Sequence, residues 1–113
     1  MILITGGLGS GRHEYARRVF RGREVLEFGP AQAKEILESG GDVGQEAGKL
    51  AAAHPEAVVI TQEVGCGIVP VDAFDRAWRE ALGRAACCLA EKSGTVILMN
   101  CGIAQAIKGR LPE

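Results

Sequence analysis

The chain has 113 residues, the size of one domain, and is long enough to bury its own core. Thirteen Lys and Arg residues against fourteen Asp and Glu give a formal net charge of −1, without the basic excess of a nucleic-acid-binding protein. No apolar run approaches the roughly 20 residues that span a membrane, and the amino terminus lacks the features of a secretory signal. We therefore expect a single cytoplasmic domain covering residues 1–113, whose four cysteines, lacking any C-x-x-C pair, are free thiols.

The first thirteen residues, MILITGGLGSGRH, combine an apolar strand, a glycine-dense turn and the start of a basic helix. Glycine reaches positive φ without a steric penalty, so such a turn can direct several backbone N–H groups at one point. A helix that begins directly behind the turn adds free amide donors and the positive end of its dipole. This pattern predicts a site for phosphate oxygen, and a tight strand–helix turn without a ligand is the alternative.

The spacing resembles the phosphate-loop template G-x-x-x-x-G-K-[ST] in its backbone and departs from it in two side chains. Gly6 and Gly11 occupy the two glycine positions, but Arg12 replaces Lys and His13 replaces Ser or Thr. Arg12 can hold phosphate oxygens through its planar fork. His13 has no hydroxyl to offer Mg²⁺, which weakens the usual metal position. The dinucleotide template G-x-G-x-x-G fails at Arg12, so a dinucleotide-binding domain in which Glu27 reaches a ribose is the weakest alternative.

Strand and helix patterns alternate along the chain. Strands are predicted over 1–5, 24–28, 57–61 and 95–100. Helices are predicted over 12–21, 30–38, 42–54 and 72–92. The remaining segment, 101–113, is predicted to form a loop, a short helical turn and a tail. Alternation of this kind indicates an α/β fold with a mainly parallel sheet flanked by helices and right-handed crossovers.

Helix starts are marked by cap residues. Pro30 suits the first turn of its helix, Asp42 forms a capping-box pattern with Gln45, and Asp72 precedes the longest helix. That helix carries an apolar stripe that we expect to be buried, made of Phe74, Ala77, Trp78, Ala81, Leu82, Ala85 and Leu89. We interpret the adjacent Cys87 and Cys88 as packing residues.

A second glycine-containing loop, QEVGCGIVP, follows the strand at 57–61. Ligand sites in open α/β sheets gather at the carboxyl ends of the strands, so we expect both glycine loops at one sheet edge. Glu63 is the carboxylate of this loop and is predicted either to hold Mg²⁺ or to accept a substrate proton, a solvated loop carboxylate being the alternative. Gly65 and Gly67 are predicted to let the backbone approach a substrate, a tight turn being the alternative.

Three segments together resemble the bifunctional adenosylcobinamide kinase / adenosylcobinamide-phosphate guanylyltransferase family: MILITGGLGSGR, VVITQEVGCGIVP and VILMNCGIAQAIKG. The resemblance covers residues 1–28 and 57–109. It implies a shortened P-loop NTPase-like fold and a role in cobalamin biosynthesis. The family phosphorylates the aminopropanol arm of adenosylcobinamide and then transfers GMP from GTP onto that phosphate. The resemblance therefore implies GTP or ATP with Mg²⁺ as cofactors, a corrinoid as partner, and a homo-oligomer.

The chain is shorter than the family between the second strand and residue 57, the region that ordinarily holds the histidine that carries GMP. No histidine lies between residues 28 and 41, and His54 stands at a helix end beside Pro55. The guanylyltransferase step is therefore in doubt.

Two functional hypotheses remain, a nucleotide-dependent kinase or nucleotidyltransferase and a degenerate, non-catalytic P-loop binding or assembly module. In the enzyme, Arg12 and Glu63 are the predicted catalytic residues, with Glu63 also the metal ligand. The predicted nucleotide-binding residues are Gly6, Gly7, Gly9, Ser10, Gly11, Arg12 and His13. The predicted substrate-binding residues are Glu63, Gly65 and Gly67.

Overall fold

The structure is a computed structural model that describes residues 1–64 and 72–112. The strands of the described chain are β1 (Ile2–Gly6), β2 (Val25–Glu27), β3 (Val58–Ile60), β4 (Thr95–Asn100) and β5 (Ile103–Lys108). The helices are α1 (Arg12–Val19), α2 (Pro30–Glu38), α3 (Val43–Ala53) and α4 (Ala73–Lys92). One sheet has the order β2-β3-β1-β4-β5, in which β1 to β4 are parallel and β5 pairs antiparallel with β4. The mainly parallel α/β fold predicted from the sequence is confirmed.

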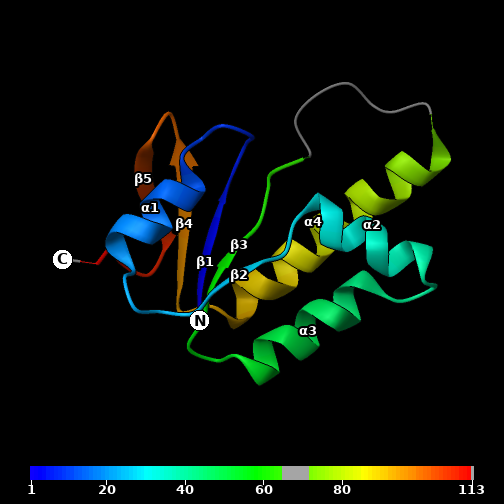
Figure 1. Cartoon of the computed structure of the whole chain (residues 1–113), viewed down its shortest axis with the longest axis horizontal. Coiled ribbons are helices and arrows are strands. Elements are labelled where there is room, and N and C mark those ends of the chain that lie inside the picture. Colours follow the sequence, from blue (N-terminus) through cyan, green and yellow to red (C-terminus); the bar gives the residue numbers. More distant parts are fainter. Residues whose placement is uncertain (65–71, 113) are drawn as a thin grey trace.

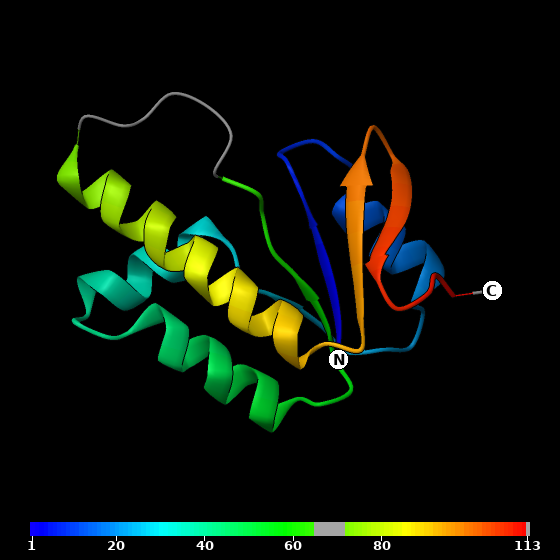
Figure 2. The same ribbon diagram turned by 180° about the vertical axis from the view of Figure 1, so that it is seen from behind.

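Helices cover both faces of the sheet (Figures 1 and 2), and each face has its own apolar core. On one face, α1 packs Tyr15, Ala16 and Phe20 against side chains of the central strands. On the other, α2, α3 and α4 pack together over the sheet. Leu3 and Ile4, neighbours on β1, belong to opposite cores and are 2% and 0% exposed. Burial on both faces explains why the central strands are apolar at nearly every position.

The predicted helix caps are confirmed. Asp42 accepts a hydrogen bond from the Gln45 backbone N–H at 3.0 Å. Asp72 accepts from the N–H groups of Phe74 and Asp75 at 2.7 and 3.3 Å. These carboxylates fix where α3 and α4 begin.

The prediction for the carboxyl-terminal segment is wrong, because residues that were expected to form a loop and helical turn form β5. Cys101 and Gly102, both at positive φ (51° and 76°), make a two-residue turn between Asn100 and Ile103, which are paired in the sheet. Turns with two positive φ angles match the twist of antiparallel strands and favour a hairpin. β5 therefore covers the edge of β4.

The apolar stripe of α4 is shorter than predicted. Phe74 is 38% exposed and Ala77 is also exposed, because the first turn of α4 extends past the edge of the sheet (Figure 1). From Trp78 onward the stripe meets the core as expected. Cys87 is exposed rather than packed, whereas Cys88 is half-buried, and both are free thiols. Within residues 1–64 and 72–112, no helix is long and apolar enough to cross a membrane.

Candidate functional site

The glycine loop between β1 and α1 needs its glycines for two reasons. Gly6, Gly9 and Gly11 have positive φ angles of 153°, 76° and 95°, which disfavour any side chain. A Cβ on Gly6 would lie 2.6 Å from the carbonyl oxygen of Met99, and one on Gly11 would lie 3.2 Å from the Cα of Gly102. The loop thus packs directly on the β4–β5 hairpin.

Two backbone hydrogen bonds hold the loop in this shape. Ser10 N–H donates to the Gly7 carbonyl at 3.2 Å, and Gly102 N–H donates to the Ser10 carbonyl at 2.9 Å. The second bond joins the loop to the hairpin turn that follows β4. The carboxyl-terminal hairpin is therefore part of the support for the glycine loop, a role that the sequence did not suggest.

The start of α1 leaves backbone donors available. Its N-cap is Gly11, which has no side chain to accept from the first-turn N–H groups, and these groups have no acceptor within the helix. Three buried polar atoms at this edge also lack a hydrogen-bond partner in the described part of the chain: Ser10 Oγ, Arg12 Nε and Thr61 Oγ1. A buried donor or acceptor left unpaired costs about 1–3 kcal/mol. Unpaired groups clustered beside a helix start fit a bound anion.

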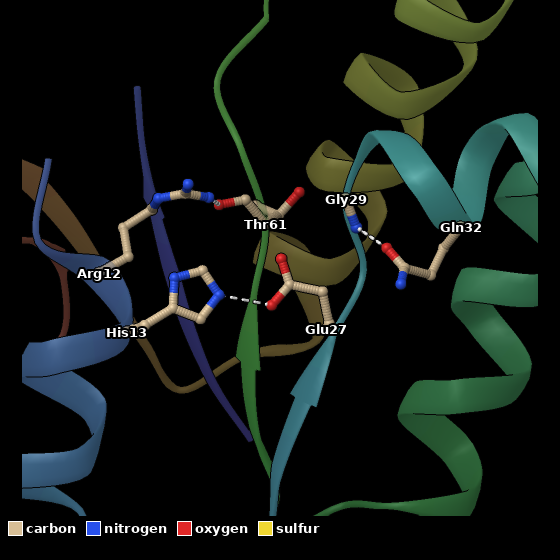
Figure 3. Close-up of polar contacts among 6 residues, drawn as sticks. All are labelled: Arg12, His13, Glu27, Gly29, Gln32 and Thr61. Atoms are coloured by element: carbon tan, nitrogen blue, oxygen red, sulfur yellow. Dashed lines mark hydrogen bonds and ion pairs between the residues drawn. The ribbon is translucent and has the colours of Figure 1, made fainter. Parts of the chain in front are cut away.

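Arg12 is buried, with only 4% of its surface exposed. Its Nη1 donates to the Thr61 backbone carbonyl at 2.5 Å, which ties α1 to the end of β3 (Figure 3). Desolvation lowers the pKa of Arg12, and the nearby Glu27 carboxylate partly offsets this effect. One guanidinium nitrogen is thus engaged by protein, while the buried Nε still lacks a partner among the described residues.

His13 points away from the loop toward the end of β2. Its Nε2 lies 2.7 Å from Glu27 Oε2, and both side chains are about half exposed (Figure 3). Mg²⁺ prefers oxygen ligands in octahedral geometry. An imidazole already bonded to a carboxylate does not supply one, so this position does not fit the Mg²⁺ that a phosphate loop usually carries. Within the described residues, no group of three or more His, Cys, Asp or Glu side chains is placed to hold a metal.

The segment that follows β3 runs beside the glycine loop, as predicted. Glu63 N–H donates to the Gly6 carbonyl at 2.8 Å, so Glu63 and the loop share one sheet edge. Between them is a polar cleft of about 410 Å³. Its lining residues are Gly7, Leu8, Gln62, Glu63, Val64, Arg79 and Asn100. Gly65 and Gly67, the other predicted substrate contacts, lie outside the described residues.

Sequence reasoning missed Arg79, which brings a positive charge from α4 to the polar cleft. Its Nη1 donates to the Val64 carbonyl at 3.3 Å, and its guanidinium carbon lies 4.8 Å from the centre of the Trp78 ring. The one feature of the sequence that could have indicated Arg79 is its position directly after Trp78, which was predicted to be buried. Lys108, by contrast, donates to the carbonyls of Ala90 and Glu91 at the end of α4 and has a structural role.

His54 lies at the opposite end of the sheet from the glycine loop. It ends α3 at the amino end of β3, and its Nδ1 lies 2.8 Å from Glu24 Oε1. It borders a larger hollow of about 620 Å³ between α2 and α3, whose lining also includes Glu27 but none of the glycine-loop residues. This hollow is larger than the polar cleft, but Glu63 does not line it either, whereas Glu63 and Gly7 both line the polar cleft.

The fold and this edge define an α/β protein of the P-loop type, in which a glycine loop joins the first strand to a helix and lies beside a carboxylate in the segment that follows the neighbouring strand. The family model of cobinamide kinase / cobinamide phosphate guanyltransferase matches residues 31–107, more than half of the chain. The chain belongs to this family, and the family resemblance of the sequence is confirmed. Its role is cobinamide kinase/guanyltransferase-like, in cobalamin biosynthesis. A search of curated proteins returned no match.

Proposed function

We propose that the protein is a kinase that transfers the γ-phosphoryl group of GTP or ATP to the hydroxyl of a cobinamide. The observation that carries the proposal is the set of unpaired buried polar atoms around the start of α1, next to a glycine loop whose Gly6 carbonyl accepts from the Glu63 N–H. Family membership supplies the substrate class.

The nucleotide phosphates bind at the loop from Gly6 to His13 in this proposal. The backbone N–H groups of Gly7, Gly9 and Gly11 and the hydroxyl of Ser10 surround the β- and γ-phosphates. Arg12 adds positive charge through its unpaired Nε, and Arg79 adds charge from the opposite wall. Phosphoryl transfer depends mainly on position and charge, which such a loop supplies.

Glu63 accepts the proton of the attacking hydroxyl. It is the carboxylate that lines the cleft among the described residues, and its backbone is fixed against Gly6. Glu63 is also the predicted metal ligand, and Mg²⁺ held there would be bound without His13. No step is assigned to the metal, because the His13 position does not fit it.

Calorimetric titration with GTP and with ATP, each with and without Mg²⁺, tests nucleotide binding. We expect binding in the micromolar to millimolar range, with a smaller dependence on Mg²⁺ than a loop carrying Lys and Ser would have. Absence of heat at millimolar nucleotide would overturn the proposal. A cobinamide phosphorylation assay then tests turnover, with Glu63→Gln as the variant expected to lose it.

The second candidate function is a non-catalytic binding or assembly module of the same family. It is favoured by the engagement of Arg12 with Thr61 and of His13 with Glu27, which replaces the usual lysine and hydroxyl contacts. A wild-type protein that binds nucleotide but is inert, and whose Arg12→Lys/His13→Ser variant turns over cobinamide, would establish this second function. We do not assign guanylyl transfer to His54, because it lies at the opposite end of β3 from the polar cleft.

A further inference from the structure

A second hollow, which we call the apolar groove, continues from the polar cleft along the α4 face of the sheet. It encloses about 300 Å³. Leu3 and Val96 form its floor, and Gly83, Ala86 and Cys87 of α4 form one wall. The polar cleft and the apolar groove share four lining residues: Gln62, Glu63, Val64 and Arg79. α4 lies on the face of the sheet opposite α1 (Figure 2), so the groove approaches the glycine loop from the side away from that helix.

Arg79 marks the junction of the two hollows. Stacking on Trp78 and the bond to the Val64 carbonyl fix the guanidinium in place. Its Nε is buried and has no hydrogen-bond partner within residues 1–64 and 72–112. A fixed cation with an unused donor, at the point where a polar hollow meets an apolar one, is complementary to an anionic group on an apolar arm.

We propose that the apolar groove holds the hydroxyl-bearing arm of the acceptor alcohol, and that Arg79 binds the phosphoryl group as it arrives on that hydroxyl. This inference rests on the proposed kinase function and adds the acceptor site to it. About 300 Å³ is at the lower limit of small-molecule pockets, so the groove accommodates an uncharged aliphatic arm while a macrocycle stays outside.

The reaction at the junction balances without a further reactant. The alcohol oxygen attacks the γ-phosphorus and forms the new P–O bond. The bond between the γ-phosphorus and the β–γ bridging oxygen breaks, and the nucleoside diphosphate leaves with the electron pair. The hydroxyl proton passes to Glu63, and Arg79 holds the phosphate of the resulting alkyl phosphate.

The first test fills the groove. Gly83 of α4 lines the groove, and a Cβ there would meet no atom within 4 Å, so Gly83→Leu adds apolar bulk at the groove wall without weakening the helix. Gly48→Leu on α3 is the matched control, because it is also helical, equally unobstructed, and outside both hollows. We expect Gly83→Leu to weaken cobinamide binding at least tenfold and to leave nucleotide affinity unchanged. Equal cobinamide affinity in Gly83→Leu and Gly48→Leu would overturn the assignment of the groove.

Cys87 reports occupancy of the groove in the wild-type protein. It lines the groove and is exposed, whereas Cys101 is exposed on the hairpin turn and lines neither hollow. Bound cobinamide should slow the reaction of Cys87 with N-ethylmaleimide several-fold and leave Cys101 unchanged, as measured by mass spectrometry. Cobinamide that binds without protecting Cys87 would refute the groove but not the kinase. If neither nucleotide nor cobinamide binds, both proposals fail.

Arg79→Gln separates phosphate recognition from a structural role. A hydrogen bond to a charged group is worth roughly ten- to hundredfold in affinity. The variant should therefore weaken cobinamide phosphate by at least about tenfold while changing cobinamide binding little. Equal losses for both ligands would indicate a collapsed groove and would overturn the role of Arg79.

Discussion

Alanine substitution of three glycines tests whether the loop is held by the β4–β5 hairpin. Gly7→Ala should be nearly neutral, within about 0.5 kcal/mol, because its φ is not in the disfavoured range and its Cβ would meet nothing within 4 Å. Gly9→Ala also meets nothing, but its φ of 76° costs a side chain about 1–2 kcal/mol. Gly11→Ala combines a φ of 95° with a 3.2 Å approach to Gly102 Cα. Overpacking adds about 1–3 kcal/mol, for a total of about 2–5 kcal/mol.

Urea unfolding followed by circular dichroism measures these differences. With a slope of about 1–3 kcal/mol per M urea for a small domain, the Gly11→Ala midpoint should fall by roughly 1 M or more. Gly9→Ala should lie between Gly11→Ala and Gly7→Ala. If Gly9→Ala and Gly11→Ala unfold at the same urea concentration, the contact with Gly102 does not support the loop. If Gly7→Ala is as damaging as Gly11→Ala, the described loop conformation is wrong.

Three further predictions concern stability. Asp72→Ala removes the cap of α4 and should lower the free energy of unfolding by about 1 kcal/mol in urea titrations, and an unchanged midpoint would contradict the cap. Trp78→Phe removes the indole donor to Asp75 and weakens stacking with Arg79, so we expect a loss of about 1–2 kcal/mol, and a stability equal to wild type would show that these contacts contribute nothing. Burial raises the pKa of Tyr15, so the folded state retains the phenol proton longer than the unfolded state, and stability should decline as pH rises from about 10 through the raised value. Tyr15→Phe should remove that part of the decline above about pH 10, and an identical pH profile would refute it.

The elements with strong local signals were predictable from the sequence. The apolar strands and the caps at Asp42 and Asp72 were found because burial on both faces and side-chain capping each leave a local pattern. β5 was missed because its decisive feature, positive φ at Cys101, is rare for a residue other than glycine and has no dependable sequence signal. Phe74 was wrongly predicted to be buried, because helical periodicity does not show where a helix extends beyond the sheet on which it packs.

The proximity of the two segments of the candidate site was predictable, and the side-chain contacts there were less so. In a parallel sheet the glycine loop and Glu63 both follow the carboxyl ends of strands, so they lie at one edge regardless of their side chains. Their proximity therefore followed from the order of the elements. Arg79 was not predictable, because an arginine on a helix ordinarily faces water. Its place at the cleft depends on the hydrogen bond to the Val64 carbonyl, which only the tertiary fold brings to it.

The two departures from the phosphate-loop template form one structural unit. Glu27 of β2 is hydrogen-bonded to His13 and partly offsets the lowering of the Arg12 pKa by burial, so a single carboxylate acts on both positions. Arg12 in turn bonds the carbonyl of Thr61, which joins α1 to the end of β3. Changing either position alone would leave Glu27 or Thr61 without its present partner beside the site where phosphate is proposed to bind. An unpaired carboxylate there repels phosphate. Arg12→Lys/His13→Ser therefore restores the side chains of a Lys–Ser loop but leaves the Glu27 charge, and we expect Glu27→Gln added to that double variant to strengthen nucleotide binding further.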